Sequence, residues 1–396
     1  MIRGLKEPFF ILLISAFSAM LGLGVISPFL PEFARQHGAN GFWLGMIFAG
    51  FGLSRGLVMP LIGALSDRLG RKVFVVSGLF LFSVISLFYP LAGSVYSLTL
   101  VRMVHGLSAG MIIPIVMAYA GDVAPSGREG STAGSVTAMF YMGLAAGPLM
   151  GGVIAENFGF NAVFYSMSGL AALNTAVVAF FLPDTGRRKR TDSVPRSPGF
   201  SGLIRYNYIK AILVLAFIGT LLLAVFMSFL PVIGERDMID TVHIGIIVSM
   251  GIFIAGIFQM PFGKLSDSLD RTGKLFQVST GTSIGLFALF SIPFCPDFHA
   301  LLVSGCFLGA GAGVSTPALS GLSFEIGHKA GMGRWMGIYN AAMSAGFVAA
   351  PVISGLVLDT MGIDSVFYVF GIFAFFCVLL SGHYYRRRLK YGIKAG

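Results

Sequence analysis

The chain has 396 residues, of which 56% are hydrophobic and only 11% charged, with a formal net charge of +10. Soluble globular domains carry about 25% charged residues, so this composition argues against a soluble enzyme or binding module and predicts one integral membrane body. The basic excess would also suit nucleic acid, but its placement along the chain indicates another origin.

Continuous apolar runs of about 20 residues, the length with which an α-helix crosses a bilayer, recur along the whole chain. They lack the alternating pattern of β-barrel strands, so we expect helices as the only spanning structure. The twelve predicted spans are 8–31, 43–64, 73–92, 97–120, 132–154, 162–182, 208–232, 243–263, 275–294, 300–322, 335–358 and 365–385.

The positive charges gather in every second connection between these spans. With both termini in the cytoplasm, all but four of the 27 Lys and Arg lie in or at the edge of cytoplasmic segments. Cytoplasmic loops retain Lys and Arg, so the charge indicates topology, in a cytoplasmic (inner) membrane. The basic runs at 187–190 and 386–388 suit the anionic head groups of a lipid bilayer, and we expect no nucleic-acid partner.

Short motifs recur at an offset of 200 to 203 residues, as when Met59-Pro60 returns as Met260-Pro261. We therefore predict an N-terminal six-helix bundle at 1–182, a Pro- and Gly-containing cytoplasmic linker at 183–207, and a C-terminal six-helix bundle with a basic tail at 208–396. Two such halves, related by an axis along the membrane normal, are a known transporter plan with the substrate site between them near the midplane.

The turn after the second span carries the most specific motif, Gly63-Ala64-Leu65-Ser66-Asp67-Arg68-Leu69-Gly70-Arg71-Lys72. An anion beyond a helix C-terminus is disfavoured by the helix dipole, so Asp67 needs the cations that follow it. This turn resembles the loop 2–3 signature of the major facilitator superfamily. The resemblance implies that Asp67 faces the N-terminus of the eleventh span and Arg128, forming a latch that holds the outward-facing state. The alternative is that these charges only set topology.

The second copy of this turn, at 263–271, keeps Asp267 and Arg271. It has Ser268 in place of Arg68 and Asp270 in place of Gly70. We include Asp267 and Arg271 among the latch residues, but these changes leave open whether a symmetric second latch forms.

The fourth span places Arg102, Gly106 and Gly110 at intervals of four residues, on one helix face, with His105 one turn after Arg102. This resembles the superfamily's span-four signature, which implies a role for Arg102 in proton coupling; an ionisable residue inside a span is a functional candidate by default. We add His105, which can titrate near neutral pH, and Glu32 near the outer end of span one. The alternatives are that Arg102 snorkels to the interface and that His105 is a packed neutral residue.

The fifth span contains Gly143, Gly147, Pro148, Gly151 and Gly152. Small residues four apart allow close helix contact, and Pro148 removes one helix hydrogen bond. The string resembles the superfamily's antiporter signature and, with Gly22 to Pro31 in span one, its twelve-span drug/proton antiporter subgroup. Close packing alone would also explain the glycines.

Arg55 lies about 16 Å, or 11 residues, from the cytoplasmic end of span two, close to the midplane. A cation at that depth must face a cavity or a partner, and no acid lies at a comparable depth in any predicted span. We therefore place Arg55 in a substrate cavity. Polar, aromatic and Met side chains that could line it, although each is individually more typical of packing, are Met139, Tyr141, Phe226, Gln259 and Asn340.

No P-loop, zinc motif or catalytic triad is present, so we expect no enzymatic activity, catalytic residues, metal site or cofactor. The sequence predicts an all-α membrane protein of the major facilitator fold, acting as a monomeric secondary transporter. Its partners would be a small-molecule substrate and protons, in multidrug efflux by alternating access. The alternative is a uniporter or importer of a small, possibly anionic, metabolite.

Overall fold

A computed structural model describes residues 3–26, 30–39, 41–183, 207–239 and 241–390. Within these ranges a few side chains, among them the Glu32 side chain, are not described. Every regular element in this part of the chain is helical. The first group comprises α1 (Arg3–Ile26), α2 (Leu30–Gln36), α3 (Gly41–Leu69), α4 (Arg71–Ser86), α5 (Val95–Val123), α6 (Glu129–Phe158) and α7 (Phe160–Phe181). The second comprises α9 (Asn207–Arg236), α10 (Thr241–Ser268), α11 (Arg271–Ser291), η1 (Ile292–Phe294), α12 (Phe298–Ala330), α13 (Met332–Met361) and α14 (Ile363–Lys390).

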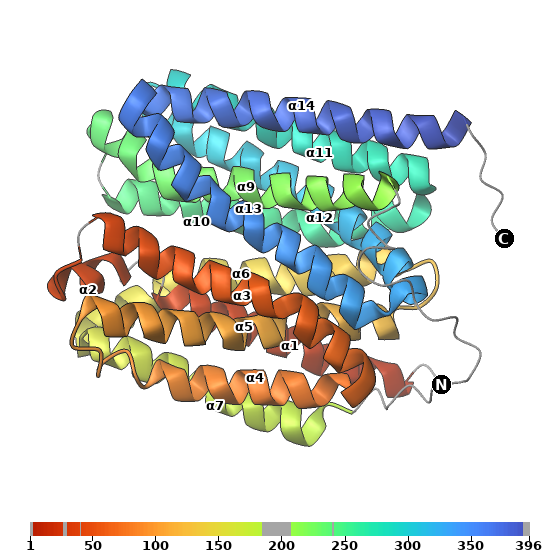
Figure 1. The fold of residues 1–396 in the computed structure, drawn as a ribbon, viewed down its shortest axis with the longest axis horizontal. Coiled ribbons are helices and arrows are strands. Elements are labelled where there is room, and N and C mark those ends of the chain that lie inside the picture. The colour runs from red at the N-terminus through yellow and green to blue at the C-terminus, as the bar shows by residue number, and fades with distance from the viewer. Residues whose placement is uncertain (1–2, 27–29, 40, 184–206, 240, 391–396) are drawn as a thin grey trace.

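The long helices lie side by side, with the red-to-yellow first group below and the green-to-blue second group above in Figure 1. The two groups meet mainly where α3 packs against α13 and where α6 packs against α10. The predicted division at 1–182, 183–207 and 208–396 stays a prediction, because residues 184–206 fall outside the described part of the chain.

Ten described helices are long and apolar enough to cross a membrane, and an eleventh apolar stretch, Ile363–Leu379, is shorter. The predicted span 73–92 differs most, because α4 has only 16 residues and ends at Ser86. Pro90 follows shortly, and proline disfavours a helical conformation at the residue before it. In span one, α1 begins at Arg3, five residues before the predicted start, and is described as far as Ile26; residues 27–29 fall outside the described part of the chain.

Large apolar side chains cover the outside of the bundle as well as its core. Leu57, Phe180 and Phe287 are 72%, 82% and 73% exposed, whereas Phe164 and Trp335 are buried in the main core cluster. A water-facing surface would not carry such residues along so many helices. The outer faces are therefore suited to lipid.

Candidate functional site

The turn between α3 and α4 binds the first turn of α13. The Asp67 carboxylate accepts hydrogen bonds from the backbone N–H groups of Gly333 and Arg334, both at 2.8 Å. The N-cap residue of α13 is Gly331, and no side chain of α13 caps the helix. Asp67 therefore supplies the cap from another helix, and its charge complements the positive end of the α13 dipole.

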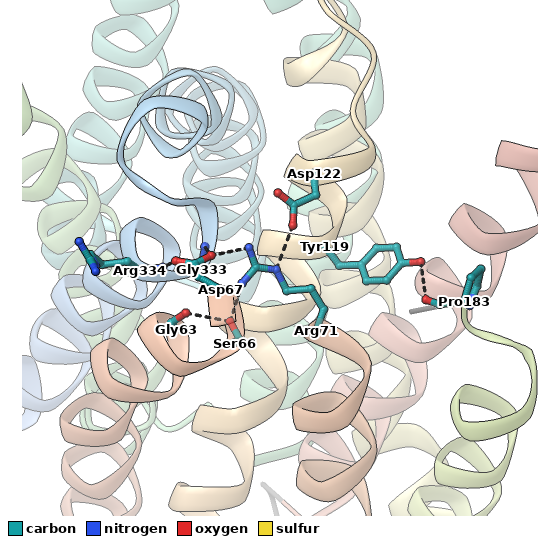
Figure 2. A network of polar contacts seen from close by, with 9 residues as sticks. All are labelled: Gly63, Ser66, Asp67, Arg71, Tyr119, Asp122, Pro183, Gly333 and Arg334. Carbon is teal, nitrogen blue, oxygen red and sulfur yellow. Dashed lines mark hydrogen bonds and ion pairs between the residues drawn. The ribbon is translucent and has the colours of Figure 1, made fainter. Parts of the chain in front are cut away.

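Arg71, the first residue of α4, holds Asp67 in place (Figure 2). Its guanidinium donates to Asp67, to Asp122 at the end of α5 and to the Ser66 hydroxyl at 2.6, 2.9 and 2.6 Å. The Arg71 side chain is only 5% exposed, so water and salt screen these pairs weakly. Gly70 makes the turn possible, because its φ of 97° lies in a region that other residues avoid.

The turn between α10 and α11 does the same for α6. Asp267 accepts hydrogen bonds from the backbone N–H groups of Gly130 at 2.7 Å and Ser131 at 3.0 Å. The N-cap residue of α6 is Arg128, which makes no side-chain cap. The two helix groups thus exchange N-caps, and both exchanges lie at one end of the bundle, called here the latch end.

The charges around the two caps differ. Arg271 donates to Glu325 at 2.9 Å, and Lys274 donates to the same carboxylate at 2.8 Å. Among the described residues no ion pair joins a cation to Asp267. Asp270, where the first copy has Gly70, has a φ of −68° and caps its own helix α11. Asp270 therefore serves α11. The cap that Asp267 supplies to α6 is complete although position 270 is not a glycine.

The expected contact of Arg128 with Asp67 is not made: none of the described interactions joins their side chains. Arg128 lies instead at the start of α6, next to the cap supplied by Asp267, and Arg71 is the cation at Asp67. Arg68 is exposed to the surroundings. Its neighbour Arg71 is closer to Asp67 because it begins α4 and points back across the turn.

Glycines bring the two groups together at both caps. A side chain on Gly63 would collide with the Gly333 carbonyl oxygen, and one on Gly263 would come within 2.6 Å of the Gly130 carbonyl oxygen. Both caps therefore depend on helix backbones in direct contact.

Gly63→Ala is expected to lower the thermal unfolding midpoint by several degrees, because overpacking a tight contact costs about 1–3 kcal/mol. The measurement is thermal unfolding in detergent. Gly169→Ala is the matched control, since a side chain there meets nothing within 4 Å. Equal midpoints for the two variants would contradict the close contact.

At the opposite end of the bundle, ion pairs join helices of the same group. Arg236 at the end of α9 donates to Asp237 and to Asp364 at the start of α14. Hydrogen bonding to Asp237 raises the pKa of Arg236 above its ordinary value. This end has no described counterpart of the exchanged caps.

Arg102 of α5 lies in an aromatic cage. Its guanidinium carbon is 5.2 Å from the ring centre of Phe51, 5.7 Å from that of Phe48 and 5.9 Å from that of Tyr89. Its exposed fraction is 4%, so Arg102 does not snorkel to the interface in this structure. Ring faces attract a guanidinium and partly offset its burial.

His105 is fully buried beside Arg102. Its Nδ1 lies 2.7 Å from the Tyr89 hydroxyl. Its ring packs edge-on against Phe82, with the two ring centres 4.1 Å apart. Its Nε2 has no hydrogen-bond partner in the described structure. Glu32, the third proton-coupling candidate, lies in α2, and its side chain falls outside the described residues.

Arg55 joins the two groups near the middle of α3. Its Nε donates to the Ser344 hydroxyl of α13 at 3.2 Å, and its guanidinium lies 5.7 Å from the ring centre of Phe51. Phe51 thus contacts both Arg55 and Arg102. Among the described residues no ion pair joins either arginine to a carboxylate, so the site carries an excess of positive charge.

A cavity of about 60 Å³ lies among α9, α11, α12 and α13. No charged residue lines it. Its polar lining consists of hydroxyl groups, on Tyr141, Thr220, Thr282, Ser315, Thr316 and Tyr339. Drug-sized ligands occupy sites of about 300–1,000 Å³, so the helices must separate before such a ligand fits.

Of the predicted cavity residues, Tyr141 lines this cavity, whereas Arg55, Met139, Phe226, Gln259 and Asn340 do not. Phe226 is buried in the core of the second group. Gln259 accepts a hydrogen bond from Thr137 at 2.7 Å across the α6–α10 contact. Asn340 donates to the Met336 carbonyl of its own helix, and Met139 packs against the main core cluster. Phe226, Gln259 and Met139 are held in packing and Asn340 by its own helix, which the sequence pattern did not distinguish from facing a cavity.

Comparison with known proteins decides the family. The sequence model of the Major Facilitator Superfamily matches residues 12–333 and 212–392. The chain belongs to this superfamily. It is similar to quinolone resistance protein NorA of Staphylococcus aureus, with 25% identity over 397 residues, 98% of this chain and 99% of that protein. It is also similar to multidrug resistance protein 2 of Bacillus subtilis, with 27% identity over 364 residues, 89% of each protein.

The fold is that of the superfamily. The crystal structure of the human organic anion transporter MFSD10 (TETRAN) superimposes with a TM-score of 0.79 at 18% identity, covering 95% of this chain and 99% of that one. The chain is therefore a multi-pass membrane transporter of the Major Facilitator Superfamily, and the resemblance drawn from its motifs is confirmed.

In this superfamily member the span-five glycines face α1. A side chain on Gly143 would collide with the Phe17 carbonyl oxygen, and one on Gly147 would collide with the backbone of Gly24. Pro148 lies inside α6 and Gly151 is buried, whereas the surroundings of Gly152 fall outside the described residues. The described glycines act in packing between α1 and α6.

Several residues of the site were missed from the sequence. Asp122, Glu325 and Ser344 contribute by pairing with cations on other helices, and Tyr89 lies in a turn. One sequence feature could have identified two of them: Asp122 and Glu325 occupy corresponding positions in the two repeats, as do Arg71 and Arg271, with which they pair.

Proposed function

We propose that this transporter exports small amphiphilic compounds in exchange for protons by alternating access. The exchanged caps at Asp67 and Asp267 carry the proposal. They join the two helix groups at one end, and the described residues show no counterpart at the other, as expected for one end-state of a rocking transporter. The latch end would face the cytoplasm of a monomer in the inner membrane, in agreement with the basic loops.

The buried Arg102–His105 pair supports proton coupling, because ionisable groups inside a membrane commonly mark proton pathways. The uncharged cavity supports an amphiphilic substrate, since apolar walls with a few hydroxyl groups suit such ligands. NorA and multidrug resistance protein 2 are named for drug resistance, which agrees with export of drug-like compounds.

Arg55 and Arg102 favour a second candidate, transport of an organic anion. Arg102 is buried and Arg55 is half-buried. Two such cations that lack a described carboxylate partner would attract a negatively charged group. The structural neighbour MFSD10 is described as an organic anion transporter.

Proteoliposomes with an internal pH-sensitive dye distinguish these candidates. Cationic, neutral and anionic amphiphiles are supplied under an imposed proton gradient, with the wild type compared with Arg102→Ala. Substrate-dependent proton flux that disappears in the variant is expected for antiport. Substrate movement without proton flux would contradict antiport and favour facilitated transport.

Gly219→Leu is expected to reduce transport at least about tenfold, because the new side chain occupies the cavity and overpacking it opposes ligand entry. Gly219 lines the cavity, and a Cβ there meets nothing within 4 Å, so the empty protein accommodates the change. Gly169→Leu, where a Cβ also meets nothing, is the control. Transport rates in vesicles, normalised to protein content, make the comparison; equal rates would remove the cavity from the substrate path.

A further inference from the structure

Tyr89 is a turn residue buried inside the bundle. It lies between α4 and α5, immediately before Pro90, and its exposed fraction is 0%. Turn residues usually lie at the surface. The burial of a large polar side chain at such a position indicates specific contacts inside the protein.

The ring and the hydroxyl group of Tyr89 both make specific contacts. One face stacks on Phe164 of α7, with ring centres 4.8 Å apart and planes at 1°. The ring centre lies 5.9 Å from the Arg102 guanidinium carbon. The phenol oxygen lies 2.7 Å from Nδ1 of His105. Tyr89 is thus the side chain through which Arg102 and His105 are joined.

We propose that Tyr89 is a positioning residue that makes protonation of His105 depend on where Arg102 lies. While Arg102 lies against the Tyr89 ring, its charge disfavours a second cation at His105, and the phenol O–H donates to Nδ1 of the neutral imidazole. When Arg102 leaves, this repulsion is lost, and the phenol oxygen accepts a hydrogen bond from protonated Nδ1.

The groups around His105 fit this arrangement. Its own helix α5 contributes Arg102, and α4 contributes the uncharged Phe82. Helix α3 presents Phe51, and Arg55 also lies against that ring. Behind Phe164, α2 presents Phe33, whose ring centre lies 4.5 Å from that of His37 with the planes tilted by 47°. Among the described groups, Arg102 and Tyr89 are the ionisable side chains with an interaction at His105.

The inference rests on the proposed proton exchange, and a Tyr89 series tests it in the full-length protein in proteoliposomes. The probe is a fluorescent quinolone, and the readouts are transport against pH and protons moved per quinolone. Tyr89→Phe keeps the ring but removes the hydroxyl. It is expected to shift the pH of half-maximal transport by about one unit. That is the size expected when a group loses one hydrogen bond that had favoured one of its protonation states. Tyr89→Leu also removes the ring and is expected to lower the maximal rate about tenfold or more.

Controls separate positioning from packing. Tyr96→Phe makes the same change at an exposed tyrosine and is expected to leave the pH profile unchanged. In a His105→Asn background, Tyr89→Phe is expected to add no further shift, because the two residues act as a unit. This double variant also decides the matter if Tyr89→Phe alone folds poorly.

Two results would overturn the inference, and they differ from each other. A wild type that transports the quinolone without moving protons rejects the proposed exchange itself. A wild type that exchanges protons, beside a Tyr89→Phe variant with an unchanged pH profile and proton ratio, rejects only the role of Tyr89.

Discussion

Asp67→Asn is expected to abolish most transport, whereas Asp267→Asn is expected to retain a substantial part of it. Both substitutions weaken two hydrogen bonds to a helix N-terminus of the other group. Hydrogen bonds to a charged group contribute about 1.5–3 kcal/mol each. Removing the charge therefore shifts the balance of the two end-states by about 2 kcal/mol or more, which is roughly 30-fold.

The difference between the two variants comes from Arg71. In Asp67→Asn this buried guanidinium loses one of its two carboxylates and is left partly unpaired, which adds a further cost. No described cation pairs with Asp267, so Asp267→Asn leaves no such charge behind. Arg271 and Lys274 keep their own partner, Glu325.

Transport rates and the width of the latch end would be measured together. Spin labels at exposed positions 126 and 268, introduced after replacement of the three native cysteines, report the distance between the groups. Asp270→Asn is the matched control: it lies in the same turn but caps its own helix, where Asn serves about as well as Asp. Equal losses in Asp67→Asn and Asp267→Asn would contradict the role of Arg71, and unchanged distances in both would contradict the latch.

The helical fold was accessible from the sequence because a membrane span depends on a long apolar run rather than on its neighbours. The boundary that was wrong, at the end of α4, lies shortly before Pro90, where a proline interrupts apolar sequence. The position of Asp67 at α13 also followed from the motif. The completeness of the second cap did not, because Gly130 and Ser131 take part through their backbones, which no side-chain comparison reveals.

The substrate site was less accessible, because the face to which a buried side chain points is set by helix packing. Gln259 and Phe226 were reasonable polar and aromatic candidates, yet they are held in helix contacts. Tyr141 carried the same kind of signal and does line the cavity. Tyr89 gave no signal, since its importance depends on contacts that one turn makes with α5 and α7.

Arg55→Met is expected to stabilise the protein while removing transport of anionic substrates. A cation near the centre of a span costs about 2.5–3.5 kcal/mol. In this structure the Ser344 hydroxyl and the Phe51 ring offset only part of that cost. The repeat-related position is Gly256, which packs against Tyr141 where Arg55 packs against Ser344. The fold thus accepts an uncharged residue at this contact, and the charge is best explained by a ligand.

Three variants make the test quantitative. Arg55→Met should raise the thermal midpoint by a few degrees, because a half-buried charge with no described carboxylate partner is replaced by an apolar side chain of similar length. Arg55→Lys keeps the charge without the planar fork, so it should retain weakened transport of a carboxylate-bearing probe. Arg102→Met removes a cation that three rings enclose, so any stabilisation there should be smaller. If Arg55→Met transports cationic, neutral and anionic probes at wild-type rates, Arg55 does not contact the substrate, and its charge must be balanced within the protein in another conformation.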